Sequence, residues 1–152
     1  MRRIMLGSLA LASMNLALAG PVDKPIDTIL KDYTTIQTAL ANDTTEGVDQ
    51  AAEAIHRTAA SISATDPEVK ALVSEIKTAS KDIQGKDLEA ARTEFFKLSK
   101  PLLVYLNKFH ANKDGYHRFY CPMAQKGWIQ SEAGTKNPYY GSSMLTCGEK
   151  IG

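Results

Sequence analysis

The chain has 152 residues, and its 18 Lys and Arg against 17 Asp and Glu give a formal net charge of +1. This near balance, without a basic cluster, argues against a nucleic-acid partner, because phosphate binding needs concentrated Lys and Arg. The length fits about one domain, which can bury a helical core without disulfide support.

The first residues have the pattern of a signal peptide. Arg2 and Arg3 form a positive start, residues 4–18 are mostly apolar, and Ala17-Leu18-Ala19 offers the small-x-small pattern of a signal peptidase site. The apolar run is shorter than the roughly 20 residues that span a bilayer. We therefore expect a signal peptide over residues 1–19, cleavage near Ala19, a periplasmic location and no membrane insertion of the mature chain.

Residues 20–112 contain four segments with helical periodicity. The first runs from Pro25 to about Ala41, with apolar residues at steps of three and four. The second follows a cap at Thr44 or Thr45 and has a weaker, alanine-rich stripe. These stripes consist of Ile26, Ile29, Leu30, Tyr33, Ile36 and Leu40 in the first segment and Val48, Ala51, Ala52, Ile55, Ala59 and Ile62 in the second.

The third and fourth segments have clearer boundaries. Asp66 is a good N-cap, Pro67 fits the first helical position, and Gly85 suits a left-handed C-terminal cap. The fourth segment begins near Asp87 and extends to Phe109. Pro101 lies inside it and predicts a kink or a break, because proline removes one backbone donor.

Four amphipathic segments with short polar connections predict an all-α fold, an up-down-up-down antiparallel four-helix bundle. From Lys113 onward helical periodicity disappears, and we expect residues 113–152 to form an irregular extension packed on the bundle, within one domain overall. Residues 116–120 and 127–130 are candidates for short strands in this extension. Large aliphatic side chains are few there, so its order should depend on docking and on whatever joins the two cysteines.

The only two cysteines each lie in a short motif with a methionine: Cys121 precedes Met123, and Met144 precedes Cys147. Thiolate and thioether sulfurs are soft ligands that select Cu(I) and its neighbours. His117 is an optional further ligand, although in an extended segment positions 117 and 121 share a face while lying far apart. The candidate metal ligands are therefore Cys121, Cys147, Met123, Met144 and His117.

A disulfide between the two cysteines is the alternative. In an oxidising compartment such a bridge would contribute about 3 kcal/mol on the chain-entropy model, and the methionines would then fill gaps in a core. A reversible form is also open, with the pair oxidised when empty and reduced when loaded. A turn at residues 137–141 would aim Cys147 at Cys121. Trp128, Tyr139 and Tyr140 would either cover the site or pack the tail on the bundle.

These motifs resemble the signature of an uncharacterised periplasmic domain family. The resemblance rests on Tyr-Cys-Pro-Met-Ala, a following Trp, Asn-Pro-Tyr-Tyr-Gly and Met-Leu-x-Cys-Gly, and upstream on residues 95–99, which are similar to the family's Phe-x-x-Leu-Ser element. Members occur alone or appended to heavy-metal efflux adaptor proteins of the copper/silver type. The resemblance implies a helical domain linked to copper handling. Many relatives look richer in histidine than this chain, which has three.

We therefore expect a periplasmic Cu(I) or Ag(I) binding protein, a buffer or carrier whose partners are the metal ion and a heavy-metal efflux adaptor. The alternative is an interaction module with a permanent disulfide, docking an efflux or envelope partner through the surface around Tyr139 and Tyr140. The chain has no nucleophile elbow, phosphate-binding glycine loop or His-Glu-x-x-His helix. We therefore expect it not to be an enzyme.

Overall fold

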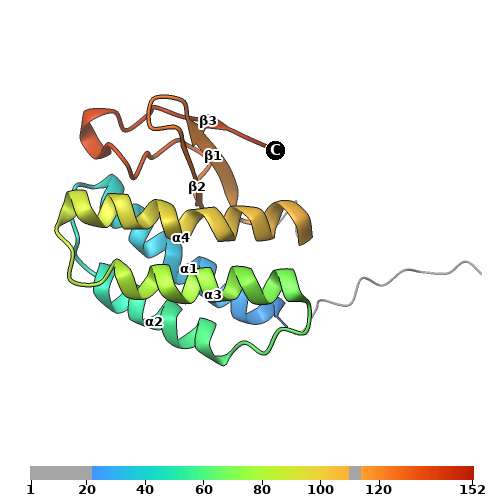
Figure 1. The fold of residues 1–152 in the computed structure, drawn as a ribbon. Helices are drawn as coiled ribbons and strands as arrows, with labels where there is room; N and C mark the ends of the chain where they lie inside the picture. The colour runs from blue at the N-terminus through green and yellow to red at the C-terminus, as the bar shows by residue number, and fades with distance from the viewer. Residues whose placement is uncertain (1–21, 110–113) are drawn as a thin grey trace, which may run out of the picture.

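A computed structural model of the protein describes residues 22–109 and 114–152. The predicted signal peptide and the predicted boundary between bundle and extension lie outside the described residues. Four helices form the larger layer (Figure 1): α1 (Asp23–Ala41), α2 (Val48–Ser61), α3 (Pro67–Asp82) and α4 (Leu88–Phe109). Within the described ranges, none of these helices has both the length and the apolar content to cross a membrane.

The boundary of α3 follows the local signal in the sequence, whereas the predicted cap of α2 at Thr44 or Thr45 is wrong, because α2 begins after Gly47 without a side-chain cap. The Asp66 carboxylate accepts hydrogen bonds from the backbone N–H groups of Glu68 and Val69, which confirms it as the N-cap of α3. The sequence predicts a kink or a break at Pro101. The break does not occur, because α4 continues through this residue. Completely buried Leu98 and Leu102 on either side of Pro101 hold both halves of the helix on the core.

The prediction of an all-α fold with an irregular extension is wrong. The C-terminal region forms a three-stranded antiparallel sheet from β1 (His117–Cys121), β2 (Lys126–Gln130) and β3 (Glu149–Lys150), in the order β2-β1-β3. A short 3-10 turn, η1 (Gly141–Ser143), lies between β2 and β3. The candidate strands at residues 116–120 and 127–130 correspond to β1 and β2. The third strand comes from a segment that gave no strand signal.

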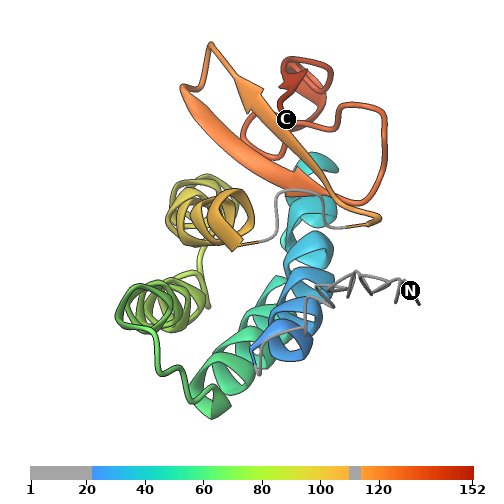
Figure 2. The same cartoon turned by 90° about the vertical axis from the view of Figure 1, so that its right-hand side faces the viewer.

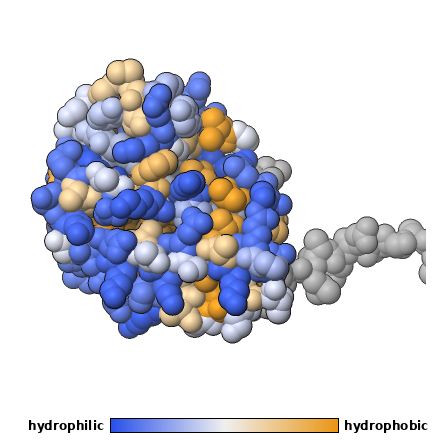
Figure 3. Space-filling view, viewed as in Figure 1, coloured by the Kyte–Doolittle hydropathy of each residue, from blue (hydrophilic) through white to orange (hydrophobic). Residues whose placement is uncertain are grey.

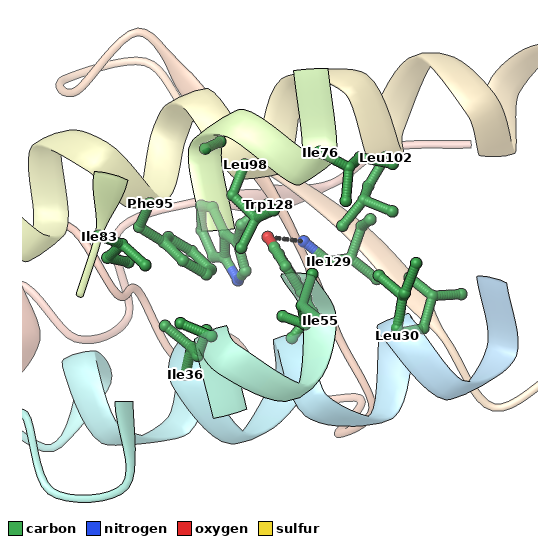
Figure 4. Packing of buried hydrophobic residues seen from close by; sticks show 14 of the residues in the cluster. Leu30, Ile36, Ile55, Ile76, Ile83, Phe95, Leu98, Leu102, Trp128 and Ile129 are labelled. Carbon is green, nitrogen blue, oxygen red and sulfur yellow. Dashed lines mark hydrogen bonds between the residues drawn. The ribbon is translucent and has the colours of Figure 1, made fainter. Parts of the chain in front are cut away.

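The sheet completes the core that the helices leave open. Figure 2, a view along the helices, shows the sheet lying over α1 and α4, and β2 contacts both of them. Trp128 and Ile129 of β2 are completely buried among helix side chains such as Leu98 and Leu30 (Figure 4). α1 and α4 also contact each other directly, and β2 packs on both, so helices and sheet share one core.

A buried chain of hydroxyl groups fastens the sheet to the helices. The Tyr33 hydroxyl on α1 and the Ser99 hydroxyl on α4 are 2.7 Å apart, and the backbone N–H of Ile129 donates to Tyr33 at 3.2 Å. The Tyr139 hydroxyl donates to the Gly127 carbonyl at 2.6 Å. Burial raises the pKa of Tyr33 and of Tyr139, which keeps both phenols protonated and able to donate. Satisfied polar groups of this kind favour one docked position of the sheet.

Hydrophilic side chains cover most of the face seen in Figure 3, and apolar ones gather in narrow strips. Five large apolar side chains of the described residues are nevertheless substantially exposed: Phe109, Tyr120, Met123, Met144 and Ile151. Three of these five belong to the two cysteine motifs. The exposed apolar surface is therefore concentrated around the candidate site.

Candidate functional site: a dithiol between the hairpin and the C-terminal loop

The two cysteines meet, although 26 positions separate them in sequence. Cys121 is the last residue of β1 and is completely buried, whereas Cys147, in the loop before β3, is half-buried. Both are free thiols, and their Sγ atoms are 2.8 Å apart. A covalent disulfide would hold them at about 2.05 Å. The site is therefore a hydrogen-bonded dithiol with one inner and one outer sulfur.

The turn that follows Cys121 directs backbone donors at its sulfur. Residues 122–125 reverse the chain between β1 and β2, and Gln125 takes a left-handed conformation with φ of 53°. The Ala124 N–H then donates to Cys121 Sγ at 3.4 Å, and the Met123 N–H also faces this sulfur. The sulfur occupies the place that the side-chain oxygen of Asp or Asn takes in an Asx turn.

The two thiols have opposite pKa shifts. Burial alone would raise the pKa of Cys121, but hydrogen bonds from the Cys147 thiol, from the N–H groups of Ala124 and Met123 and from the Asn137 side chain bring it below its ordinary value. The hydrogen bond to Cys121 and burial raise the pKa of Cys147. The first thiolate to form is therefore the inner one, with Cys147 as its donor.

The Asn-Pro-Tyr-Tyr-Gly motif holds the outer cysteine in place. Asn137 is completely buried, its Nδ2 donates to the Cys147 carbonyl at 2.7 Å, and its backbone N–H donates to the Leu145 carbonyl at 2.8 Å. Its Oδ1 accepts from the Tyr139 N–H at 2.8 Å. The predicted turn at residues 137–141 is present, and Asn137 is the residue that connects it to Cys147.

The aromatic residues Trp128 and Tyr139 are buried on the core side of the site. Trp128 is completely buried, and a Cβ atom on Gly148 would lie 2.4 Å from its ring, so the residue after Cys147 rests directly on the indole. Tyr139 is only 7% exposed. Of the two roles considered for Trp128 and Tyr139, packing of the tail is the one observed, and Tyr139 offers no surface for docking a partner.

The remaining predicted ligands differ in their relation to the dithiol. Met123 and Met144 are 67% and 37% exposed, so they do not fill the core but lie at the surface next to the cysteines in sequence. His117 is at the opposite end of β1 from Cys121. Four steps along a strand amount to about 13 Å, so the structure does not bring His117 to the sulfurs. The described residues contain no cluster of three or more His, Cys, Asp and Glu side chains suited to a metal.

Arg92 on α4 joins the helices to the motif, a role that the sequence analysis missed. It is 8% exposed, and it donates to the Leu40 carbonyl at the end of α1 at 3.0 Å and to the Pro138 carbonyl at 3.1 Å. Its Nη2 is 2.6 Å from Asp43 Oδ1, and Asp43 Oδ2 accepts from the Ser142 N–H at 3.1 Å. One buried guanidinium thus positions the loop that carries Cys147.

We call the contacts of Arg92 with Leu40, Pro138 and Asp43 the Arg92 junction, and Gly141→Ala tests it. Gly141 has φ of 56°, and an added Cβ would lie 1.8 Å from Asp43 Oδ1 and 2.4 Å from Arg92 Nη2. The left-handed conformation costs an alanine about 1–2 kcal/mol, and displacing the ion pair adds to it, so we expect urea unfolding to show a loss of about 3 kcal/mol. The control is Gly85→Ala, with φ of 68° but open space around it. Equal losses in the two variants would contradict the proposed crowding.

Acid should weaken the interaction of Asp43 with Arg92 and Ser142. Hydrogen bonds from Ser142 and Arg92 lower the pKa of Asp43 to about 2, whereas a free aspartate has a pKa of about 3.9. Because the folded pKa is the lower one, the stabilisation is complete above about pH 4 and is lost as the pH falls towards 2. We expect the difference in unfolding free energy between wild type and Asp43→Asn to shrink between pH 5 and pH 2. A constant difference over this range would contradict this.

The fold and the site together define a small helical domain with a docked antiparallel sheet that presents a dithiol. A family model described as "Protein of unknown function (DUF3347)" matches residues 29–114. The match covers more than half of the chain, so the chain belongs to this family, and the predicted membership of a family of unknown function is confirmed. The matched range begins within α1 and ends before β1, so it contains most of α1 and all of α2, α3 and α4 but not the cysteine motifs. No curated protein and no solved structure gives a match.

Proposed function

We propose that this protein binds a soft monovalent metal ion, Cu(I) or Ag(I), between the sulfurs of Cys121 and Cys147, and acts as a buffer or carrier. The observation that carries the proposal is the 2.8 Å approach of two free thiols from distant parts of the chain, with backbone N–H groups directed at the inner one. Donors directed at a sulfur stabilise the thiolate, which is the form that binds metal.

The composition of the site favours a soft ion of low coordination number. Two thiolates suffice for Cu(I) or Ag(I), for which the two sulfurs must move apart from their 2.8 Å contact, whereas structural Zn²⁺ takes four ligands. The thioethers of Met123 and Met144, exposed beside the cysteines, offer weaker soft donors by which an ion can enter and leave through ligand exchange. His117 has no part in this proposal, because β1 separates it from Cys121 by its full length.

The proposed setting is the periplasm, and the proposed partner is a heavy-metal efflux adaptor. The signal peptide pattern of residues 1–19 supports export, and the resemblance of the cysteine motifs to domains appended to copper/silver efflux adaptors supports the partner. The proposed role is binding without catalysis.

Competition for Cu(I) under reducing conditions tests the proposal. We expect the wild-type protein to take about one Cu(I) from a chromogenic Cu(I) chelator, Cys121→Ser and Cys147→Ser each to lose at least a hundredfold in affinity, and Zn²⁺ not to compete. The matched control is His117→Ala, on the same strand as Cys121, which should bind as wild type does. Equal Cu(I) uptake by wild type and the double serine variant would contradict the proposal.

The short distance between the sulfurs also favours the second candidate, a structural disulfide in a non-catalytic interaction module. In that case Tyr140, Tyr120 and the exposed methionines, rather than buried Tyr139, would make the docking surface. A permanent bridge predicts no free thiol in protein isolated from its own compartment and a loss of about 3 kcal/mol on reduction. Two free thiols in freshly isolated protein would exclude it.

A further inference from the structure

We propose that the dithiol also carries out ordered thiol–disulfide exchange with an external disulfide, in which Cys147 forms the mixed disulfide and Cys121 resolves it. This activity goes beyond metal binding and does not require a bound ion. It is stoichiometric, because each reduced chain consumes one external disulfide of the glutathione class and becomes internally oxidised.

The order follows from the unequal access to the two sulfurs. Cys121 is completely buried at the end of β1, beneath the hairpin turn, whereas Cys147 is half-buried in the loop that leads to β3. An external disulfide must therefore meet Cys147 first, since exchange requires direct contact between the attacking sulfur and the disulfide. Tyr120, Met123 and Met144 of the same two motifs are also exposed, so these motifs lie at the surface of the domain.

The second step follows from the distance between the sulfurs. Once Cys147 carries the external group, Cys121 Sγ is already 2.8 Å from the sulfur that it has to attack. The hydrogen bond from the Asn137 side chain to the Cys147 carbonyl and the contact of Gly148 with Trp128 hold the outer residue in this position. The inner thiol is thus a resolving group at close range that external reagents do not reach.

The exchange balances in atoms and electrons. Cys147 first releases to solvent the proton that it donates to Cys121, and its thiolate then attacks one sulfur of glutathione disulfide, forms the Cys147–glutathione bond and releases one glutathione thiolate. The Cys121 thiolate then attacks the Cys147 sulfur, forms the Cys121–Cys147 bond and releases the second glutathione. The protein loses two electrons and two protons, and glutathione disulfide becomes two glutathione thiols. Oxidation removes both proposed metal ligands, so it would also regulate metal binding.

The test uses reduced, metal-free full chain and glutathione disulfide, with adducts mapped by mass spectrometry. We expect Cys121→Ser to accumulate a stable mixed disulfide on Cys147, and Cys147→Ser to form an adduct on Cys121 at least tenfold more slowly. Wild type should end with an internal disulfide and no bound glutathione. An adduct on Cys121 that forms as fast as the one on Cys147, or glutathione retained by wild type, would overturn the proposal.

A second measurement covers the case in which a serine variant fails to fold. Wild-type protein is quenched with acid at short times, and the transient adduct is located by peptide mapping. Adduct on the peptide containing Cys147 supports the order, and adduct on the peptide containing Cys121 overturns it. Because no metal is present, failure here leaves the Cu(I) competition result unaffected, and failure of Cu(I) binding leaves this exchange unaffected.

Discussion

Replacing Arg92 by alanine should destabilise the protein by about 3 kcal/mol. The substitution removes the donors to the Leu40 and Pro138 carbonyls and the partner of Asp43 in one step. Breaking a buried charged pair by deleting one member typically costs about 3–5 kcal/mol, and the partial exposure of Asp43 places this case at the lower end. The effect should extend to the site, because the Pro138 carbonyl belongs to the motif that holds Cys147.

Urea unfolding followed by circular dichroism measures this loss, with Arg57→Ala as the matched control. Arg57 is also a helix arginine with an acidic partner, but its side chain is 72% exposed and its distance to Glu53 is 4.0 Å. Exposed pairs contribute about 0–1 kcal/mol, so the control should change little. If the two arginine variants lost similar stability, the assignment of Arg92 as the junction between helices and motif would be wrong.

Trp128→Ala should cost about 3–5 kcal/mol and also loosen the dithiol. The indole is completely buried, stacks on Phe119 at 5.4 Å between ring centroids and supports Gly148 next to Cys147. Truncating a buried tryptophan removes its transfer free energy and leaves a cavity. Because the cavity would lie against Gly148, the residue after Cys147, we expect Cys147 to react faster with a thiol reagent in this variant, even under conditions where the helices remain folded.

The matched control for Trp128 is Tyr120→Ala. Tyr120 lies on the neighbouring strand, opposite Gly127, but is 36% exposed. Its removal should change the unfolding free energy by less than about 1 kcal/mol, since little apolar area leaves the core. Unchanged thiol reactivity in Trp128→Ala, with Cys147 reacting as slowly as in wild type, would mean that the indole does not hold the site.

The helices could be predicted because their signals are local. The cap at Asp66, the proline at Pro67 and the apolar stripes act within a few residues of the backbone they order. The sheet could be predicted only in part: residues 116–120 and 127–130 are candidate strands in the sequence, but two features hide the sheet as a whole. In β2, Trp128, Ile129 and Gln130 are all buried, so the strand lacks the alternation that marks a half-exposed strand. β3 has only two residues and pairs with β1 about 30 residues away.

The sequence was enough to propose Cys121 and Cys147 as a site, because their ability to bind a soft metal or form a disulfide depends on the residue type alone. The residues that position them were found only in part. The turn at residues 137–141 was expected, but Arg92 has no sequence signal that distinguishes it from a surface arginine, because its partners Leu40, Asp43 and Pro138 come from two segments distant in sequence. Ser99 ends the Phe-x-x-Leu-Ser element at residues 95–99. Its hydroxyl contacts the hydroxyls of Tyr33 and Tyr139, which gives the serine of this element a structural role.

X-ray absorption at the copper edge of Cu(I)-loaded protein tests the central claim most directly, because it identifies the atoms bound to the ion. The account predicts a first shell of sulfur alone, with two short copper–sulfur distances in wild type and loss of one of them in Cys147→Ser. A first shell of nitrogen or oxygen, or a spectrum unchanged when both Cys121 and Cys147 are replaced by serine, would contradict the assignment of the dithiol as the metal site.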